Sequence, residues 1–313
     1  MTARAWAELL RISALFTVPG DALAGAAAVG RRPNRSTALA VGASLCLYEA
    51  GMALNDWADR EEDAVDRPHR PIPSGRITPR AALTAAGALT GAGLALAARA
   101  GRPALTVATG LAATVWAYDL RLKHTPAGPA AMAAARGLDL LLGATATATA
   151  TAPAKATAAA TAALPAAALL TAHTYAVTAV SRHEAQGGST TAPLAALTAV
   201  AALGGAVVRE RPGETKYAGE TKHAGEVKRA AAPARLLVTA LTGAYLRTAG
   251  RPLAHAALNP SPPLTQRAVG GGIRAMIPLQ AALAARAGAS GTALAVMGLV
   301  PLARSLSRKV SLT

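Results

Sequence analysis

The chain concentrates acidic residues in one stretch, Asn55-Asp56-Trp57-Ala58-Asp59-Arg60-Glu61-Glu62-Asp63, and is otherwise mostly apolar or basic. This stretch follows directly on a long apolar run, residues 36 to 57, whose length and helical character are typical of a membrane-spanning helix. The acidic stretch therefore marks the place where such a helix leaves the bilayer and meets water. We interpret the rest of the chain as a scaffold around this place.

The composition excludes an ordinary soluble domain. Of 313 residues, 52% are hydrophobic and only 15% are charged, which favours a multi-pass membrane protein. The formal net charge of +16 would suggest nucleic-acid binding in a soluble protein. Here Lys and Arg fall mostly between apolar runs, so positive-inside topology and contact with the lipid bilayer explain them better, and no nucleic-acid partner is expected.

The apolar runs predict an all-α bundle of nine or ten transmembrane helices in a single domain over residues 1–313. The expected helices cover approximately residues 6–29, 36–57, 79–100, 103–120, 128–150, 159–181, 191–208, 232–249 and 267–287. A last run at 290–304 is short for a membrane span, which leaves the number of helices open. In the third helix, Gly87-x-x-x-Gly91 predicts close packing against a neighbouring helix.

Residues 210–231 differ from the rest of the chain because they hold a polar hexapeptide repeat. Its three units begin at Gly213, Gly219 and Gly225. A short, polar, glycine-punctuated segment cannot bury a core, so this insert is predicted to be a loop.

The spacing of the acidic residues indicates a metal site. Asp56, Asp59 and Asp63 are three and four positions apart, which places their carboxylates on one face of a helix. Their mutual repulsion is relieved when a cation lies among them, and hard oxygen ligands favour Mg²⁺, which shares its coordination shell with phosphates. Three arginines follow in the turn-rich segment 67–76: Arg67, Arg70 and Arg76. Metal and arginines at a membrane surface predict a phosphorylated, lipid-like ligand.

Two motifs resemble a known family. Asn55-Asp56-x-x-Asp59-x-x-x-Asp63, followed by Arg-Pro-x-Arg-Pro-Ile-Pro-Ser-Gly at 67–75, is similar to the first signature of the UbiA superfamily of intramembrane prenyltransferases. Tyr118-Asp119-Leu120-Arg121-Leu122-Lys123 resembles the family's Tyr-x-x-x-Leu-Lys motif, with His124 where an Arg is common. The resemblance covers roughly the first 190 residues.

The second acidic motif of the family is altered here. The corresponding stretch, Tyr175 to Gly188, lacks the two usual aspartates and retains Glu184 as its one carboxylate. The chain therefore resembles a divergent branch. We predict that Arg182 contacts the diphosphate directly, because one carboxylate without a partner three or four residues away is a poor Mg²⁺ site. A weaker second Mg²⁺ on Glu184 is the alternative.

The resemblance implies Mg²⁺-dependent transfer of a prenyl group from a prenyl diphosphate to an acceptor that the sequence does not identify. The metal-binding and catalytic residues would be Asp56, Asp59 and Asp63, and the substrate-binding residues would be Asn55, Arg67, Arg70, Tyr118, Lys123, Arg182 and Glu184. Both acidic regions must reach one head group, so residues 58–78 and 182–190 are expected on the same, cytoplasmic side of the cell membrane. A non-catalytic UbiA-like lipid-binding or transport protein is the alternative function.

Several polar residues are expected inside the bundle. Arg136 and Asp139 are three residues apart, which favours an ion pair between them over a role in lining the cavity. Asp21, at membrane depth, either contacts a ligand or makes structural hydrogen bonds. Three aromatic residues are candidates to stabilise a carbocation with their ring faces: Tyr48, Tyr118 and Tyr175.

Overall fold

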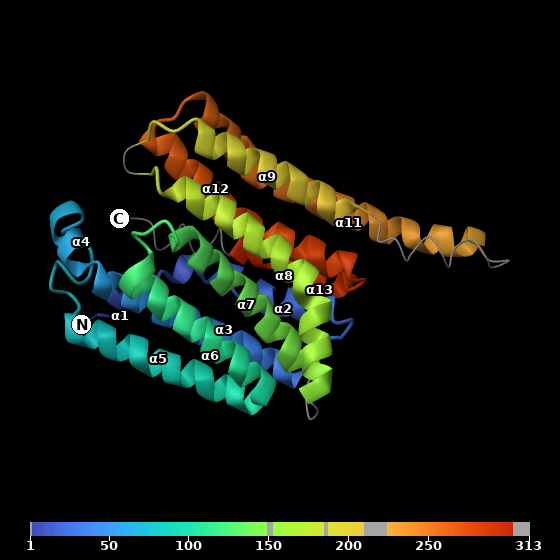
Figure 1. Ribbon diagram of the computed structural model, residues 1–313, viewed down its shortest axis with the longest axis horizontal. Helices are drawn as coiled ribbons and strands as arrows, with labels where there is room; N and C mark the ends of the chain where they lie inside the picture. The colour runs from blue at the N-terminus through green and yellow to red at the C-terminus, as the bar shows by residue number, and fades with distance from the viewer. Residues whose placement is uncertain (1, 149–152, 185–186, 210–223, 303–313) are drawn as a thin grey trace.

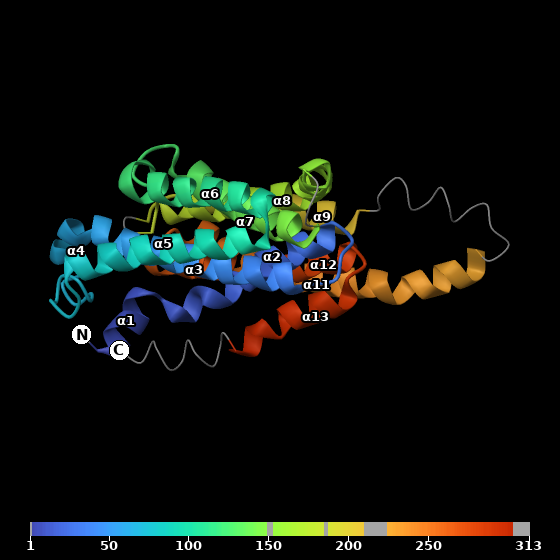
Figure 2. The same ribbon diagram turned by 90° about the horizontal axis from the view of Figure 1, so that it is seen from below.

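The computed structural model describes residues 2–148, 153–184, 187–209 and 224–302, and these residues form helices and turns without any strand. The predicted all-α fold class is confirmed. The helices run side by side along the long axis of a bundle (Figure 1). The short helix α4 lies at one end, and the N-terminal part of α11 extends beyond the other (Figure 1, Figure 2).

The first apolar run does not form the single helix predicted for residues 6–29. It is divided into α1 (Ala3–Leu9), a 3₁₀ helix η1 (Ile12–Thr17) and α2 (Pro19–Ala28). Arg11, between α1 and η1, has a left-handed backbone conformation with φ of 48°. Pro19 has no backbone N–H to donate, which suits the first position of a helix, and α2 starts there.

The next helices follow the prediction closely, except that the short helix α4 was not predicted. They are α3 (Arg35–Ala58), α4 (Arg60–Asp66), α5 (Pro79–Ala100) and α6 (Arg102–Ala117), and a π-helical turn, η2 (Tyr118–Leu122), continues α6. A reciprocal capping box between Asn34 and Thr37 starts α3. Thr78 caps α5, which has Pro79 at its first position. Local sequence signals thus explain where these helices begin.

The glycine pair in α5 does not make the predicted helix contact. An added Cβ at Gly87 or Gly91 would meet no atom within 4 Å. The close approach is made instead by Gly93, where a Cβ would lie 2.9 Å from Leu47 Cγ on α3. The register of packing therefore selects a different glycine from the one that the motif suggests.

The second half of the bundle contains α7 (Gly128–Ala148), α8 (Pro153–Ser181), α9 (Thr191–Val208), α11 (Ala224–Leu258), α12 (Pro262–Arg286) and α13 (Ser290–Met297). The prediction of a loop over residues 210–231 is wrong for the last residues of that range, because α11 begins at Ala224, inside the repeat. Residues 210–223 of that insert lie outside the described part of the chain.

Five described helices are long and apolar enough to cross a membrane: α3, α5, α8 over Lys155–Ser181, α9 and α12. The count of nine or ten spanning helices stays a prediction. The C-terminal end of α3, the turn η2 and the end of α8 lie near one another, because residues from all three line one cavity. Glu184, just beyond α8, therefore lies at the same end of the bundle as Asn55 near the end of α3, and the charge of Arg67 acts on it.

Candidate active site

The three motif aspartates lie on both sides of a helix break. Asp56 is in the last turn of α3, Asp59 ends α3 and precedes α4, and Asp63 lies within α4. Asp56 and Asp63 are buried, with exposed fractions of 4% and 2%. Two carboxylates that are this buried require nearby cations to offset the loss of water.

Arginines supply those cations. Arg70 Nη1 lies 2.6 Å from Asp63 Oδ2 and 3.5 Å from Asp56 Oδ1, so one guanidinium bridges the two aspartates. Arg67 Nη1 lies 3.3 Å from Asp63 Oδ1, and Arg11 Nη2 lies 3.1 Å from Asp56 Oδ1. Arg76, by contrast, forms an ion pair with Glu8 and not with any of the three motif aspartates.

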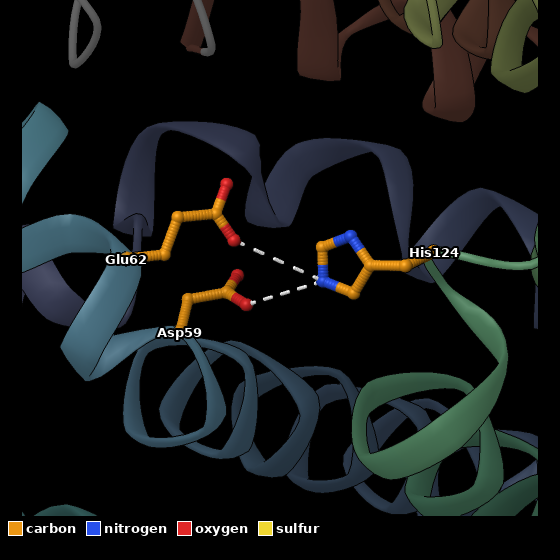
Figure 3. Close-up of side chains that lie close together, drawn as sticks. All are labelled: Asp59, Glu62 and His124. Atoms are coloured by element: carbon orange, nitrogen blue, oxygen red, sulfur yellow. Dashed lines mark ion pairs between the residues drawn. The ribbon is translucent and has the colours of Figure 1, made fainter.

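Asp59 contacts a different set of side chains from Asp56 and Asp63. Its Oδ1 contacts Lys123 Nζ and lies 3.8 Å from His124 Nε2, which is also 4.0 Å from Glu62 Oε2 (Figure 3). Ligand atoms of Asp59, Glu62 and His124 all lie within 4.8 Å of one another. Within the described ranges, this is the one group of three or more His, Cys, Asp or Glu residues close enough to hold a metal ion.

We use the name outer cluster for Arg11, Asp56, Asp59, Asp63, Arg67, Arg70 and Lys123.

Of the three predicted metal ligands, Asp56 and Asp63 provide suitable donors for Mg²⁺ around one position, whereas Asp59 lies with Lys123 and His124. Asp56 and Asp63 both face one cation, the Arg70 guanidinium, so their oxygens already converge on a position of positive charge. Carboxylate oxygens are the ligands that Mg²⁺ prefers, and the arginines are positioned to contact the phosphates with which Mg²⁺ shares its shell.

A cavity of about 540 Å³ opens beside the outer cluster, between α3, α6, η2, α7, α8 and α12. Its walls include apolar residues from five helices: Leu47, Met52, Leu111, Val115, Met132, Val177, Ile273 and Met276. Polar residues line its outer end: Arg11, Asn55, Tyr118, Asp119, Ser181 and Glu184. A second polar group, which includes Ser44, Arg136 and Asp139, lines the other end. This arrangement suits a ligand with a polar head and an apolar chain.

The predicted substrate-binding residues separate into three groups. Asn55, Tyr118 and Glu184 line the cavity, whereas Arg67, Arg70 and Lys123 contact the motif carboxylates. Arg182 does neither, since its Nη1 donates to the Thr125 carbonyl at 3.1 Å and its side chain is exposed. The geometry therefore gives no support to direct contact of Arg182 with the diphosphate.

Glu184 remains in the cavity as the carboxylate of the altered second motif. Burial raises the pKa of Glu184, and the positive charge of Arg67 acts in the opposite direction. Of the three candidate aromatic residues, Tyr48 and Tyr118 line the cavity, whereas Tyr175 is 49% exposed and does not.

The polar side chains deep in the bundle form different pairs from the predicted one. Arg136 bonds to Asp21 and Thr17, whereas Asp139 accepts a hydrogen bond from Ser44. Gln280 Nε2 donates to Asp21 Oδ1 at 2.6 Å. The predicted Arg136–Asp139 ion pair is therefore replaced by an Arg136–Asp21 pair between α7 and α2. We use the name inner cluster for Thr17, Asp21, Ser44, Arg136, Asp139 and Gln280.

Two residues of the site were not identified from the sequence. The apolar run predicts a continuous helix through Arg11, although a charge inside such a run is a signal of a break or of a buried contact. The sequence indicates Asp119 only as part of a motif. It follows Leu111 and Val115 at spacings of eight and four residues, which is the spacing of one helix face. That face lines the cavity, and Asp119 is 4% exposed.

Comparison with known proteins agrees with this geometry. Residues 13–208, more than half of the chain, match the UbiA prenyltransferase family. The chain belongs to this family. A UbiA homologue from Archaeoglobus fulgidus bound to GPP and Mg²⁺ has the same fold, with a TM-score of 0.59, 20% identity and coverage of 91% of this chain and 99% of that one. A homologue from Aeropyrum pernix K1 also gives 0.59, with 19% identity over 83% and 96% of the two chains.

Curated relatives share sequence over a shorter region. The digeranylgeranylglyceryl phosphate synthase of Methanopyrus kandleri is 38% identical over 128 residues, which cover 39% of this chain and 45% of the relative. The chain thus spans about half the length of the curated relatives that it matches. The predicted membership of the UbiA superfamily is confirmed, and the chain is a multi-pass membrane protein of that family.

Proposed function

We propose that this protein transfers a prenyl group from a prenyl diphosphate to a hydroxyl of a glyceryl phosphate acceptor, in the presence of Mg²⁺. The single observation that carries the proposal is the position of the outer cluster at the polar mouth of an apolar cavity. The relatives named digeranylgeranylglyceryl phosphate synthase support the acceptor class, because their product is a glyceryl phosphate with two prenyl chains.

The residues of the outer cluster would divide the work of binding the diphosphate. Asp56, Asp59 and Asp63 would hold Mg²⁺, which supplies positive charge to the leaving diphosphate when it is bound. Arg67 and Arg70 would transfer part of their hydrogen bonding from the carboxylates to phosphate oxygens. The apolar walls would hold the prenyl chain and keep water from the allylic cation.

The outer cluster is rich in Lys and Arg, and we assign it to the cytoplasmic side of the membrane. Its neighbouring loops carry Arg60, Arg67, Arg70, Arg76, Arg121 and Lys123. An excess of basic residues in short loops is typical of the cytoplasmic face.

A non-catalytic lipid-binding protein with the same fold is the second candidate. The loss of the second aspartate pair favours it. A protein that only binds lipid has no need for buried carboxylates held by three arginines, because each buried charge costs free energy of solvation. Turnover distinguishes the two candidates.

The experiment measures binding of radiolabelled geranyl diphosphate to the purified full chain, with and without Mg²⁺, and then its transfer to geranylgeranylglyceryl phosphate. We expect Asp59→Asn to weaken Mg²⁺-dependent binding by about 10- to 100-fold, because it removes a ligand charge and keeps the shape. Glu61→Gln is the matched control, since Glu61 is an exposed carboxylate of the same stretch that contacts Arg60. Binding by the parent without any transfer would support the lipid-binding candidate, and equal binding by Asp59→Asn would exclude Asp59 from the metal site.

A further inference from the structure

The Asp119 carboxylate has a well-defined position at the edge of the cavity. Its Oδ1 accepts a hydrogen bond from Asn55 Nδ2 at 3.1 Å, which ties it to the first motif residue on α3. Oδ2 points toward Gly51, where an added Cβ would lie 3.9 Å from it. Within the described part of the chain, no hydrogen-bond donor contacts Oδ2. One oxygen is thus fixed by the protein and the other is available to a ligand.

The backbone around Asp119 connects the cavity to the outer cluster. Asp119 lies in the π-helical turn η2, which closes with a 2.9 Å hydrogen bond from the Lys123 N–H to the Tyr118 carbonyl. The side chain of Lys123, at the end of that turn, contacts Asp59. π-helical turns are rare and occur often at functional sites. The same turn therefore presents a cation to the metal motif and a carboxylate to the cavity.

Asp119 is better placed to act on an acceptor than the other two carboxylates of the cavity. Asp139 is bonded to Ser44, which is eleven residues before Asn55 on α3, a separation of about 16 Å along a helix axis. Charges of the outer cluster act on both Glu184 and Asp119: Arg67 on the former, and Lys123, Asp59 and Arg11 on the latter. Asp119 differs in that the neutral amide of Asn55 donates a hydrogen bond to Oδ1 and fixes the carboxylate at the cavity.

The proposed reaction leaves one proton unassigned. The allylic C–O bond breaks and its electron pair departs with the diphosphate. The acceptor oxygen then uses a lone pair to form the new C–O bond, and its hydroxyl proton must leave. We infer that Asp119 is the general base of the reaction, with Oδ2 accepting the hydrogen bond and then the proton of the acceptor hydroxyl. This inference rests on the proposed function.

The surroundings of Asp119 are consistent with that role. Burial raises its pKa to about 6, against the hydrogen bond from Asn55 and the charge of Lys123, which lower it. Asp59 and Arg11 are the other charged groups that act on it, and they have opposite signs. A base with a pKa near the working pH is ionised in the resting state and still accepts a proton effectively.

The test uses the purified full chain with geranyl diphosphate, Mg²⁺ and geranylgeranylglyceryl phosphate. Asp119→Asn preserves shape, so we expect geranyl diphosphate binding within about twofold of the parent and transfer reduced by about 100-fold or more. In Asp119→Ala, added formate should restore part of the transfer, because formate fits the space of the lost carboxyl group. Glu49→Gln is the matched control, since Glu49 is also a buried carboxylate but does not line the cavity.

The results of these variants decide whether Asp119 is the general base. Transfer by Asp119→Asn within twofold of the parent overturns the inference, and so does loss of its geranyl diphosphate binding, because Asp119 would then serve the diphosphate. Absence of formate rescue in an Asp119→Ala protein that still binds geranyl diphosphate assigns a purely structural role to Asp119. A parent protein that binds geranyl diphosphate but transfers nothing to this acceptor contradicts the proposed function itself.

Discussion

The outer and inner clusters contain the same kinds of side chain in different surroundings. In the outer cluster, the side chains of Arg11 and Arg67 are 39% and 51% exposed, although the aspartates that they contact are buried. In the inner cluster, the Arg136 side chain is 12% exposed and Asp21 is fully buried. Outer arginines have access to water and can exchange a carboxylate for a phosphate. Asp21 has no such access, so its pair with Arg136 serves to hold α2 and α7 together.

This difference follows from the free-energy cost of removing a charge from water. A buried charge that loses its partner is left without water and without compensation, which is strongly unfavourable. An exposed side chain that loses its partner is rehydrated at little cost. The position of an ion pair in the bundle, more than its distance, therefore decides whether it supports binding or stability.

Arg136→Met gives the largest expected effect on stability. It leaves Asp21 buried without its cation, so we expect the free energy of unfolding to fall by about 3–5 kcal/mol. Chemical unfolding of the detergent-solubilised protein measures it. Arg67→Met is the outer control and should cost about 1 kcal/mol or less. Equal losses in the two variants would remove the distinction between the clusters.

Glu184→Gln is expected to have a smaller effect than Arg136→Met, and the quantity that it changes is the Mg²⁺ dependence of binding. If Glu184 holds a second Mg²⁺ at the cavity, the Mg²⁺ concentration for half-maximal geranyl diphosphate binding should rise about tenfold. Arg182→Ala is the matched control, because Arg182 bonds to the Thr125 carbonyl and should leave that concentration within about twofold. The opposite pattern would restore the direct arginine contact that the sequence suggested.

The smallest expected effect belongs to the exposed pair between Arg76 and Glu8. Arg76 Nη2 lies 3.0 Å from Glu8 Oε1, and the hydrogen bond lowers the pKa of Glu8 below its ordinary value of 4.5. A depressed pKa adds stability above pH 4.5, and this contribution is lost as the pH falls through the folded-state pKa. Arg76→Gln should therefore lower the free energy of unfolding by about 1 kcal/mol or less at pH 7.

The pH dependence of that variant provides its own control. At pH 3 the difference from the parent should be smaller than at pH 7, because protonated Glu8 no longer favours a cation. Thermal midpoints at the two pH values measure the change. A difference that stays constant with pH would show that Arg76 acts through its hydrogen bond to the His69 carbonyl rather than through Glu8.

Much of the fold was predictable because its signals are local. Apolar runs of sufficient length predicted α3, α5 and α9 nearly to the residue, and caps such as Asn34 and Thr78 set their starts. The prediction is wrong at Pro19, because a proline inside an apolar run starts the new helix α2 there. It also failed at Ala224, because a polar composition does not prevent helix formation.

The sequence by itself also determined the chemistry of the first motif. Asp56, Asp59 and Asp63 are close together in the chain, and Arg67 and Arg70 follow within one short turn-rich segment. Side chains three to seven residues apart are held near one another by local backbone geometry. The Asp63 contacts with Arg67 and Arg70 are of this kind.

The tertiary structure alone decided the remaining partners. Arg11 and Asp56 are 45 residues apart and Arg136 and Asp21 are 115 apart, so no local rule relates them. Arg136 has Asp139 three residues away but pairs with Asp21, because the packing of α7 against α2 brings that carboxylate to its guanidinium. Sequence spacing shows which side chains share a helix face, whereas helix packing determines what that face meets.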